Sequence, residues 1–167
     1  MNKKLFLRSI LILCFSFTLL SCSSEDVKQE DTTQPAITLR AYTQSSFEIE
    51  LLDLINQDRV SKGLNALSII NEISYVGSTH NDYMIAAGAI NHDNFSQRAE
   101  SLQAGLGALS VGENVASGFN TAQGVLNGWN NSPAHKANLE GNYTHFGVAV
   151  KADSTGKKYY TLLLIRK

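Results

Sequence analysis

Apolar residues recur every three or four positions through much of residues 45–130, which is the period of amphipathic helices. The first such segment opens with Ser45 and, three positions later, Glu48, a capping-box pattern, and Gly63 ends it. Three more helices are predicted, over Asn71–Ala87, over Ser96–Ala104 with Gly105 as the stop, and from the N-cap Thr121 up to Pro133. The pattern therefore predicts four helices before the spacing of apolar residues changes to that of strands.

From His145 onwards the apolar residues follow the period of two that is typical of strands. One strand is predicted over His145–Lys151 and a second over Lys158–Arg166, joined by the turn residues of 153–156. Residues 111–116 are either a third strand or an extended loop. Helices before and around a small antiparallel sheet indicate an α+β layered domain.

The strand that begins at His145 places this histidine on one face with Gly147 and Ala149. Residues this small leave space above them, so one interpretation is a cavity with the imidazole at its edge. The other is that a helix packs closely against the small residues and that His145 caps it by a hydrogen bond. The pattern leaves both interpretations open.

The N-terminal residues indicate export from the cytoplasm. Lys3, Lys4 and Arg8 are followed by an apolar run over residues 10–20, which is shorter than the roughly 20 residues that span a bilayer. This arrangement is typical of a secretory signal peptide rather than of an anchor helix.

The sequence Leu-Leu-Ser-Cys at positions 19–22 resembles a bacterial lipobox, in which the cysteine is lipidated and becomes the new N-terminus. We therefore expect a lipoprotein signal peptide over residues 1–21 and lipidation of Cys22, which anchors the protein to the outer membrane. The alternative is an ordinary signal peptide that is cut nearby, with Cys22 incidental. Residues 22–44 are polar and acidic, as in a flexible tether, and residues 45–167 form the predicted domain.

The cysteine content and the net charge of the predicted domain argue against several classes of function. The two cysteines are Cys14, inside the predicted signal, and Cys22, so the domain has no thiol for a disulfide, a nucleophile or a metal site. Without the three basic residues of the signal, 11 Lys and Arg stand against 15 Asp and Glu, a net charge of about −4. A mildly acidic domain without a basic stripe argues against nucleic acid as a partner.

Histidines and one glutamate supply the candidate chemistry, because imidazole and carboxylate are common both as metal ligands and as general acid–base groups. These residues are His80, His92, Glu113, His135 and His145. His80 falls on an apolar helix stripe and is predicted to be a buried, hydrogen-bonded structural histidine. Glu113 follows a glycine, so the alternative to a ligand is a carboxylate that bonds backbone amides in a tight turn.

Several sequence motifs together resemble a bacterial CAP domain. In chain order these motifs are LLDLINQDRVSKGLNAL, HNDYM, NHDNFSQR, GENVASG, GWNNSPAHKANLEGNYTHFGVAV and YYTLLL. The CAP superfamily includes the cysteine-rich secretory, antigen-5 and pathogenesis-related proteins, and the resemblance covers roughly residues 46–165. It implies a three-layer α-β-α sandwich with a groove. In many members, two histidines and two acidic residues line this groove and can bind a divalent metal such as zinc.

The resemblance assigns site residues one by one. His92 in NHDNF matches the first family histidine, Glu113 in GEN the first glutamate, and His145 in YTHFGV the second histidine. The position of the second glutamate is Ser132 here, so the tetrad is incomplete. His135, three residues further along the same helix face, is a further candidate metal ligand, and Ser132 and His135 are assigned to the ligand groove.

These observations predict a lipid-anchored cell-envelope protein whose CAP domain binds a small apolar ligand or an envelope component, with a divalent metal in the groove. The alternative is a metal-dependent hydrolase in which Glu113, His92 and His145 are catalytic. The sequence contains no HExxH or GxSxG motif and no cysteine nucleophile, so binding is the favoured function. A third reading is a purely structural or adhesive surface module, in which all four histidines are packing residues. The anchored domain is expected to face either the periplasm or the cell exterior.

Overall fold

The computed structural model describes residues 37–167. The predicted signal peptide, the lipidation site Cys22 and the tether before residue 37 lie outside the described residues. The elements are α1 (Ser46–Ser61), β1 (Ser68–Ile69), α2 (Asn71–Ala87), α3 (Phe95–Leu106), β2 (Ser110–Ser117), α4 (Ala122–Asn130), α5 (Pro133–Leu139), β3 (His145–Ala152) and β4 (Lys158–Arg166). Within residues 37–167 no helix is long and apolar enough to cross a membrane.

One sheet forms the middle layer, with the strand order β1-β3-β4-β2. The three long strands are antiparallel, as predicted, and residues 110–117 form a strand rather than a loop. β1 adds a two-residue parallel pair to β3. Two residues are too few to show a period, which is why the sequence did not predict β1.

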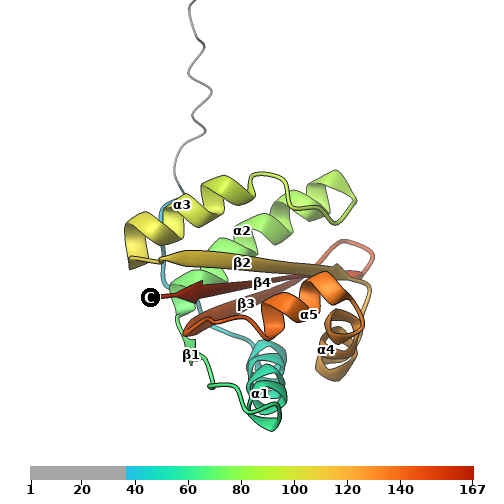
Figure 1. Cartoon of the computed structure of the whole chain (residues 1–167). Helices are drawn as coiled ribbons and strands as arrows, with labels where there is room; N and C mark the ends of the chain where they lie inside the picture. The colour runs from blue at the N-terminus through green and yellow to red at the C-terminus, as the bar shows by residue number, and fades with distance from the viewer. Residues whose placement is uncertain (1–36) are drawn as a thin grey trace, which may run out of the picture. The chain divides into compact units, whose positions relative to one another are not determined.

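Helices cover both faces of the sheet, so the fold is the three-layer sandwich that the resemblance implied (Figure 1). Alternate residues of β4 point to opposite layers. Leu162 and Leu164 pack with α1, α4 and α5, whereas Leu163 and Ile165 pack with α2 and α3. β4 is therefore buried on both faces.

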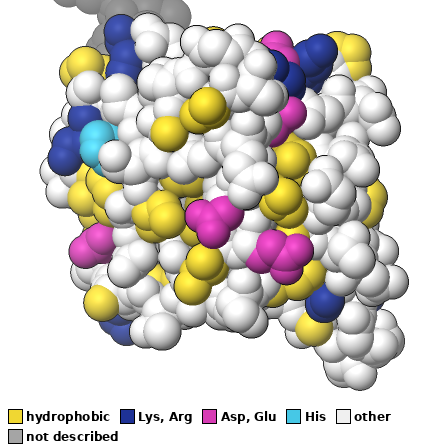
Figure 2. Space-filling view, turned by 90° about the horizontal axis from the view of Figure 1, so that it is seen from below, with side chains coloured by type: hydrophobic (Ala, Val, Ile, Leu, Met, Phe, Trp, Pro, Cys, Tyr) yellow, Lys and Arg dark blue, Asp and Glu magenta, His cyan; other side chains and the backbone are white. Residues whose placement is uncertain are grey.

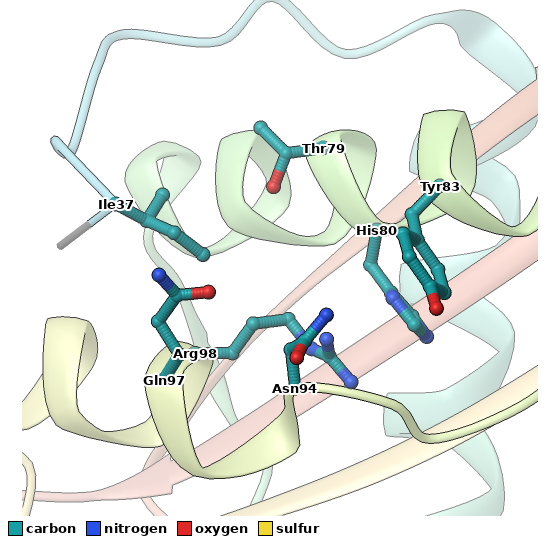
Figure 3. Close-up of a pocket in the computed structure, with 7 residues that line it drawn as sticks. All are labelled: Ile37, Thr79, His80, Tyr83, Asn94, Gln97 and Arg98. Carbon is teal, nitrogen blue, oxygen red and sulfur yellow. The ribbon is translucent and has the colours of Figure 1, made fainter. Parts of the chain in front are cut away.

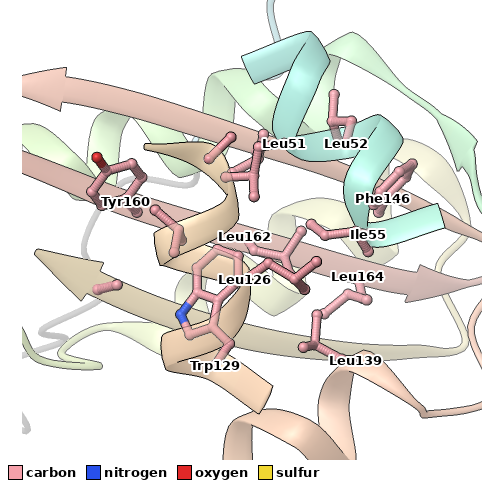
Figure 4. Close-up of a cluster of buried hydrophobic side chains, with 14 of the residues drawn as sticks. Leu51, Leu52, Ile55, Leu126, Trp129, Leu139, Phe146, Tyr160, Leu162 and Leu164 are labelled. Atoms are coloured by element: carbon pink, nitrogen blue, oxygen red, sulfur yellow. The ribbon is translucent and has the colours of Figure 1, made fainter. Parts of the chain in front are cut away.

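The core on the α1 side is built around long apolar side chains, as Figure 4 shows. α1 begins with the predicted capping box of Ser45 and Glu48. Trp129 is 1% exposed, and its indole N–H donates to the carbonyl of Val115 at 3.1 Å. Trp129 is thus a core residue that ties α4 to the neighbouring strand.

Two helix boundaries differ from the prediction. Gly105 lies inside α3, and the helix ends at Gly107, whose φ of 70° is left-handed. Only the second glycine adopts the conformation that favours glycine at a helix end. The second difference is at the end of α4, which stops at Asn130 and does not reach Pro133. After Ser132 the chain forms a separate short helix, α5, with Pro133 in its first turn.

The folded region begins before residue 45, earlier than the predicted end of the tether. Ile37 and Leu39 pack against the core on the α3 side, and the amide of Ile37 donates to Ser101 Oγ at 3.1 Å. The hydroxyl of Tyr42 donates to Glu48 Oε1 at 2.6 Å. Scattered apolar residues in a polar stretch give no period, so this packing was not visible in the sequence.

Helix α2 fills the space above the small residues of β3, so the interpretation as a cavity is wrong. A Cβ at Gly147 would lie 2.6 Å from the backbone nitrogen of Ser74 and 2.9 Å from Cβ of Ile73. A Cβ at Gly77 would lie 3.5 Å from Cβ of Ala149. The close-packing interpretation is the correct one, although His145 does not cap α2.

Replacing Gly147 with alanine should lower the free energy of unfolding by about 2 kcal/mol, because the new methyl group meets the backbone of α2. Urea unfolding of the full chain measures the change. Gly124→Ala in α4 is the control: its methyl group meets the capping hydroxyl of Thr121, and the loss of this cap is offset by the higher helix propensity of alanine, so stability should change by less than about 0.5 kcal/mol. Equal stability of the two variants would contradict the close packing of α2 on β3.

Candidate functional site

Glu113 lies in β2, on the sheet face that α2 and α3 cover, and is 5% exposed. The tight turn that the sequence allowed is therefore not present. The register pairs Glu113 with Leu163 of the buried strand β4. A carboxylate buried at this depth needs charged or hydrogen-bonding partners, and it has two.

The first partner is Arg98 of α3. Its Nε lies 2.6 Å from Glu113 Oε2 and its Nη2 lies 2.8 Å from Oε1, while Nη1 donates to the carbonyl of Asp93 at 2.6 Å. This side-on, two-bond geometry is the strongest arrangement for an arginine–carboxylate pair. Both side chains are almost fully buried.

Sequence reasoning missed Arg98, although a signal was present. Phe95, Arg98 and Leu102 follow the i, i+3, i+7 spacing of a buried helix stripe. An arginine on such a stripe indicates a buried acidic partner elsewhere in the chain.

The second partner of Glu113 is His92, in the loop before α3. Its Nδ1 lies 2.7 Å from Glu113 Oε1, and its side chain is 51% exposed. An ionised carboxylate only accepts hydrogen bonds, so Nδ1 carries a proton, and when the ring is neutral its Nε2 keeps a lone pair for a ligand. The buried Arg98–Glu113 pair thus fixes an exposed imidazole in one orientation.

Helix α5 is hydrogen-bonded to β2, the strand that carries Glu113. Asn138 Nδ2 donates to the carbonyl of Glu113 at 3.0 Å and to Asn114 Oδ1 at 2.9 Å. Asn114 Nδ2 in turn donates to the carbonyl of His135 at 3.0 Å. The asparagines of the GEN and SPAHKAN phrases therefore hold α5 on the strand that carries Glu113.

A pocket of about 220 Å³ opens beside this network. It is lined by His92, Phe95, Val111, Gly112, Glu113 and Asn138. Phe95 and Val111 supply apolar walls, and His92, Glu113 and Asn138 supply the polar groups. A side chain at Gly112 would collide with the hydroxyl of Tyr143 and with Asn138, so glycine is required for α5 and its following loop to lie this close.

His145 does not join His92 and Glu113. Glu113 pairs with Leu163 and Leu163 with Gly147, so His145 lies two strands away and two residues further along. From strand spacings this places the two Cα atoms about 12 Å apart, with the buried Leu163 and Ile165 between them. His145 Nδ1 instead lies 2.8 Å from the hydroxyl of Thr144.

His135 makes no direct contact with the His92–Glu113 pair that the structure records, although His92 affects it electrostatically. Burial and, secondly, the neighbouring His92 lower the pKa of His135. Ser132 is the N-cap residue of α5, and its side chain makes no capping hydrogen bond. Neither residue lines the pocket beside Glu113.

His80 is 2% exposed, and its Nε2 lies 2.8 Å from the carbonyl of Asn91. The prediction of a buried, hydrogen-bonded histidine is confirmed. Its ring stacks on Tyr83 with centroids 5.9 Å apart.

The residues present do not fit the divalent metal that the resemblance implied. Both oxygens of Glu113 are held by the guanidinium of Arg98, which places a positive charge beside the carboxylate that a cation would need. Within residues 37–167 no three His, Cys, Asp or Glu side chains are grouped to hold a metal ion. Four ligands were predicted, His92, Glu113, His145 and His135, and only His92 and Glu113 are in direct contact.

The comparisons with known proteins agree with the fold. The model of the cysteine-rich secretory protein family (CAP) matches residues 52–164. The uncharacterized membrane protein YlbC of Bacillus subtilis is 31% identical over 128 residues, which are 74% of this chain and 36% of that protein. The uncharacterized protein YkwD of the same organism is 29% identical over 108 residues, 62% of this chain and 42% of that protein. The chain thus spans less than half the length of these curated relatives.

Two solved structures are similar. An extracellular protein containing an SCP domain from Bacillus anthracis has a TM-score of 0.62 and 30% identity, over 72% of this chain and 40% of that one. An outer surface protein from Borrelia burgdorferi has a TM-score of 0.67 over 78% of this chain and 99% of that one. At 21% identity, the second likeness concerns the fold alone.

Proposed function

The chain belongs to the CAP family of cysteine-rich secretory proteins, and from this premise we propose that it is a ligand-binding module of the cell envelope. The observation that carries the proposal is the fixed, half-exposed imidazole of His92 at the edge of a pocket with apolar walls. The ion pair that orients His92 is buried, and burying its two charges costs desolvation free energy. A loop with a purely structural role does not need its exposed imidazole to be oriented at this cost. Few, well-placed polar groups over an apolar lining are typical of small-molecule sites.

The chemistry of the pocket indicates the kind of ligand. The lone pair on His92 Nε2 accepts a hydrogen bond, so a hydroxyl or amide N–H is the matching polar group. Phe95 and Val111 provide surface for an apolar body. The ligand is therefore a small, largely apolar molecule with one hydrogen-bond donor.

A membrane anchor completes the proposal. The lipobox-like residues that end at Cys22 supply the attachment, and the segment after them links it to the domain. Relatives named as membrane and extracellular proteins support a place outside the cytoplasm. The anchor lies in the outer membrane, and the domain faces the periplasm or the exterior.

Two alternatives have less support. A hydrolase with a covalent nucleophile needs a hydroxyl or thiol, and the six pocket residues include neither. A metal-dependent hydrolase needs room for a cation beside Glu113, and Arg98 occupies that position. An adhesive module needs an exposed apolar patch. Ile49 and Val60 of α1 are exposed. On the face that Figure 2 shows, hydrophobic side chains are scattered among polar ones.

The experiment is a titration of the full chain with hexanol, followed by NMR of the backbone amides. Hexanol has one hydroxyl and an apolar body, and it should perturb the amides of Phe95, Val111 and Asn138. The variant His92→Ala should bind hexanol about tenfold more weakly, the equivalent of one lost hydrogen bond. The matched control is His145→Ala, which changes a half-buried histidine outside the pocket and should bind as the unchanged protein does. Equal affinity of the two variants would remove His92 from the site.

A further inference from the structure

The pocket beside Glu113 has a second fixed polar group, the side-chain amide of Asn138 on α5. Its Nδ2 donates to the main-chain carbonyl of Glu113 at 3.0 Å and to Asn114 Oδ1 at 2.9 Å, so both N–H groups are used. The Glu113 carbonyl can only accept, and therefore the amide cannot be turned with its oxygen toward β2. Asn138 Oδ1 is held in place as a hydrogen-bond acceptor.

This oxygen of Asn138 is unpaired and open to solvent. It accepts no hydrogen bond from residues 37–167, and it lies 3.2 Å from the position that a Cβ on Gly112 would take. Within the same residues one side-chain polar atom is both buried and unpaired, namely Nδ1 of His80, beside the pocket between α2 and α3 that Figure 3 shows. Asn138 Oδ1 is therefore accessible, and because Gly112 and Asn138 both line the pocket beside Glu113, a ligand there can reach it.

His92 supplies a second acceptor to the same pocket. Its side chain is 51% exposed, and when the ring is neutral its Nε2 keeps a lone pair. Nε2 has no hydrogen-bond partner within residues 37–167. A ligand that satisfies both His92 Nε2 and Asn138 Oδ1 needs two N–H or O–H donors.

The main chain of Glu113 adds one donor. β2 is an edge strand, and the carbonyl of Glu113 accepts from Asn138 rather than from β4. In an antiparallel strand the N–H and the C=O of one residue point to the same side, so the N–H of Glu113 also points away from β4. It has no acceptor among residues 37–167. The Glu113 side chain is 2% exposed and the whole residue 5%, which means that main-chain atoms form part of its exposed surface.

We propose that this pocket recognises a primary carboxamide on an apolar body, with the two N–H groups donating to His92 Nε2 and Asn138 Oδ1. The carboxamide oxygen accepts from the N–H of Glu113, and the apolar body contacts Phe95 and Val111. This inference rests on the proposed function and names the polar head of its ligand. A primary carboxamide carries two donors and one acceptor, which is what the three protein groups require. A carboxylate offers acceptors alone, and an ammonium group has no acceptor for the N–H of Glu113.

The test is an NMR titration of the full chain with hexanamide. Methyl pentyl ketone is the matched ligand control, because it keeps the chain and the carbonyl and has a methyl group in place of the amide nitrogen. We expect hexanamide to perturb the amides of Val111 and Glu113 and the side-chain amide of Asn138. Hexanamide should bind at least about tenfold more tightly than the ketone, the equivalent of one net hydrogen bond. Hexanoate, which has no donor, should also bind at least about tenfold more weakly than hexanamide.

Hexanol separates failure of this inference from failure of the proposed function. If hexanol perturbs the pocket but hexanamide binds no more tightly than the ketone, the pocket remains a ligand site and the carboxamide is wrong. If neither hexanol nor hexanamide perturbs the pocket, both proposals are wrong. Binding of hexanamide as expected, without binding of hexanol, would support the carboxamide and contradict a ligand with a single donor.

A variant assigns the preference to the acceptor on α5. Asn138→Ala removes this acceptor but also releases α5 from β2, so the measured quantity is the ratio of hexanamide affinity to ketone affinity in the folded variant. This ratio should fall at least about threefold. The matched control is Asn142→Ala, which changes an exposed asparagine in the loop after α5, outside the pocket lining, and should keep the ratio. An unchanged ratio in Asn138→Ala would overturn the proposed contact.

Discussion

Replacing Arg98 with methionine is expected to lower the free energy of unfolding by about 3–5 kcal/mol, because the buried carboxylate of Glu113 then loses its charged partner. Glu113→Gln should have a similar cost, since it leaves the guanidinium buried without a counter-charge. Urea unfolding of the full chain at neutral pH measures both. The side chains are 3% and 2% exposed, so solvent does little to compensate for either loss.

The double variant Arg98→Met/Glu113→Gln shows whether the cost comes from charge or from packing. With both charges removed, most of the lost stability should return, because two neutral groups of similar size need no counter-ion. His92→Ala is the control, since it removes the exposed end of the same network and should cost less than about 1 kcal/mol. A cost below about 1 kcal/mol for Arg98→Met would contradict the pair as the support of His92.

The layered fold could be predicted because its main elements have strong local patterns. α1 carries a capping box and a clear apolar stripe, and β3 and β4 alternate around a short turn. β1 could not be predicted, since its two residues form a strand only by pairing with β3. The end of α3 was placed too early because the sequence does not say which of Gly105 and Gly107 adopts a positive φ.

The site could be predicted only in part, because its geometry depends on the order of strands in the sheet. Two contacting residues, His92 and Glu113, were identified from their phrases. His145 was grouped with them, but the buried strand β4 lies between β3 and β2 and separates them. Arg98 was not identified, since its role depends on the packing of α3 against β2.

A second arginine, Arg59 near the end of α1, connects the core to the candidate site. It is 1% exposed, and burial lowers its pKa. Its Nη1 donates to the carbonyls of Leu139 at 2.6 Å and of Gly141 at 3.0 Å, and its Nε donates to the carbonyl of Asn65 at 2.9 Å. A cation at the C-terminal end of a helix is favourable, and here it fixes the end of α5.

Arg59→Met should therefore lower the free energy of unfolding by about 4 kcal/mol, since three carbonyl groups lose a charged donor. Because α5 carries Asn138, the variant should also bind hexanol more weakly, as judged from the same amide shifts under conditions where it remains folded. Lys62→Met is the matched control: its exposed ion pairs with Asp58 and Glu140 should be worth less than about 1 kcal/mol. If Arg59→Met lost stability but bound hexanol normally, the arginine would support the core without positioning α5 at the pocket.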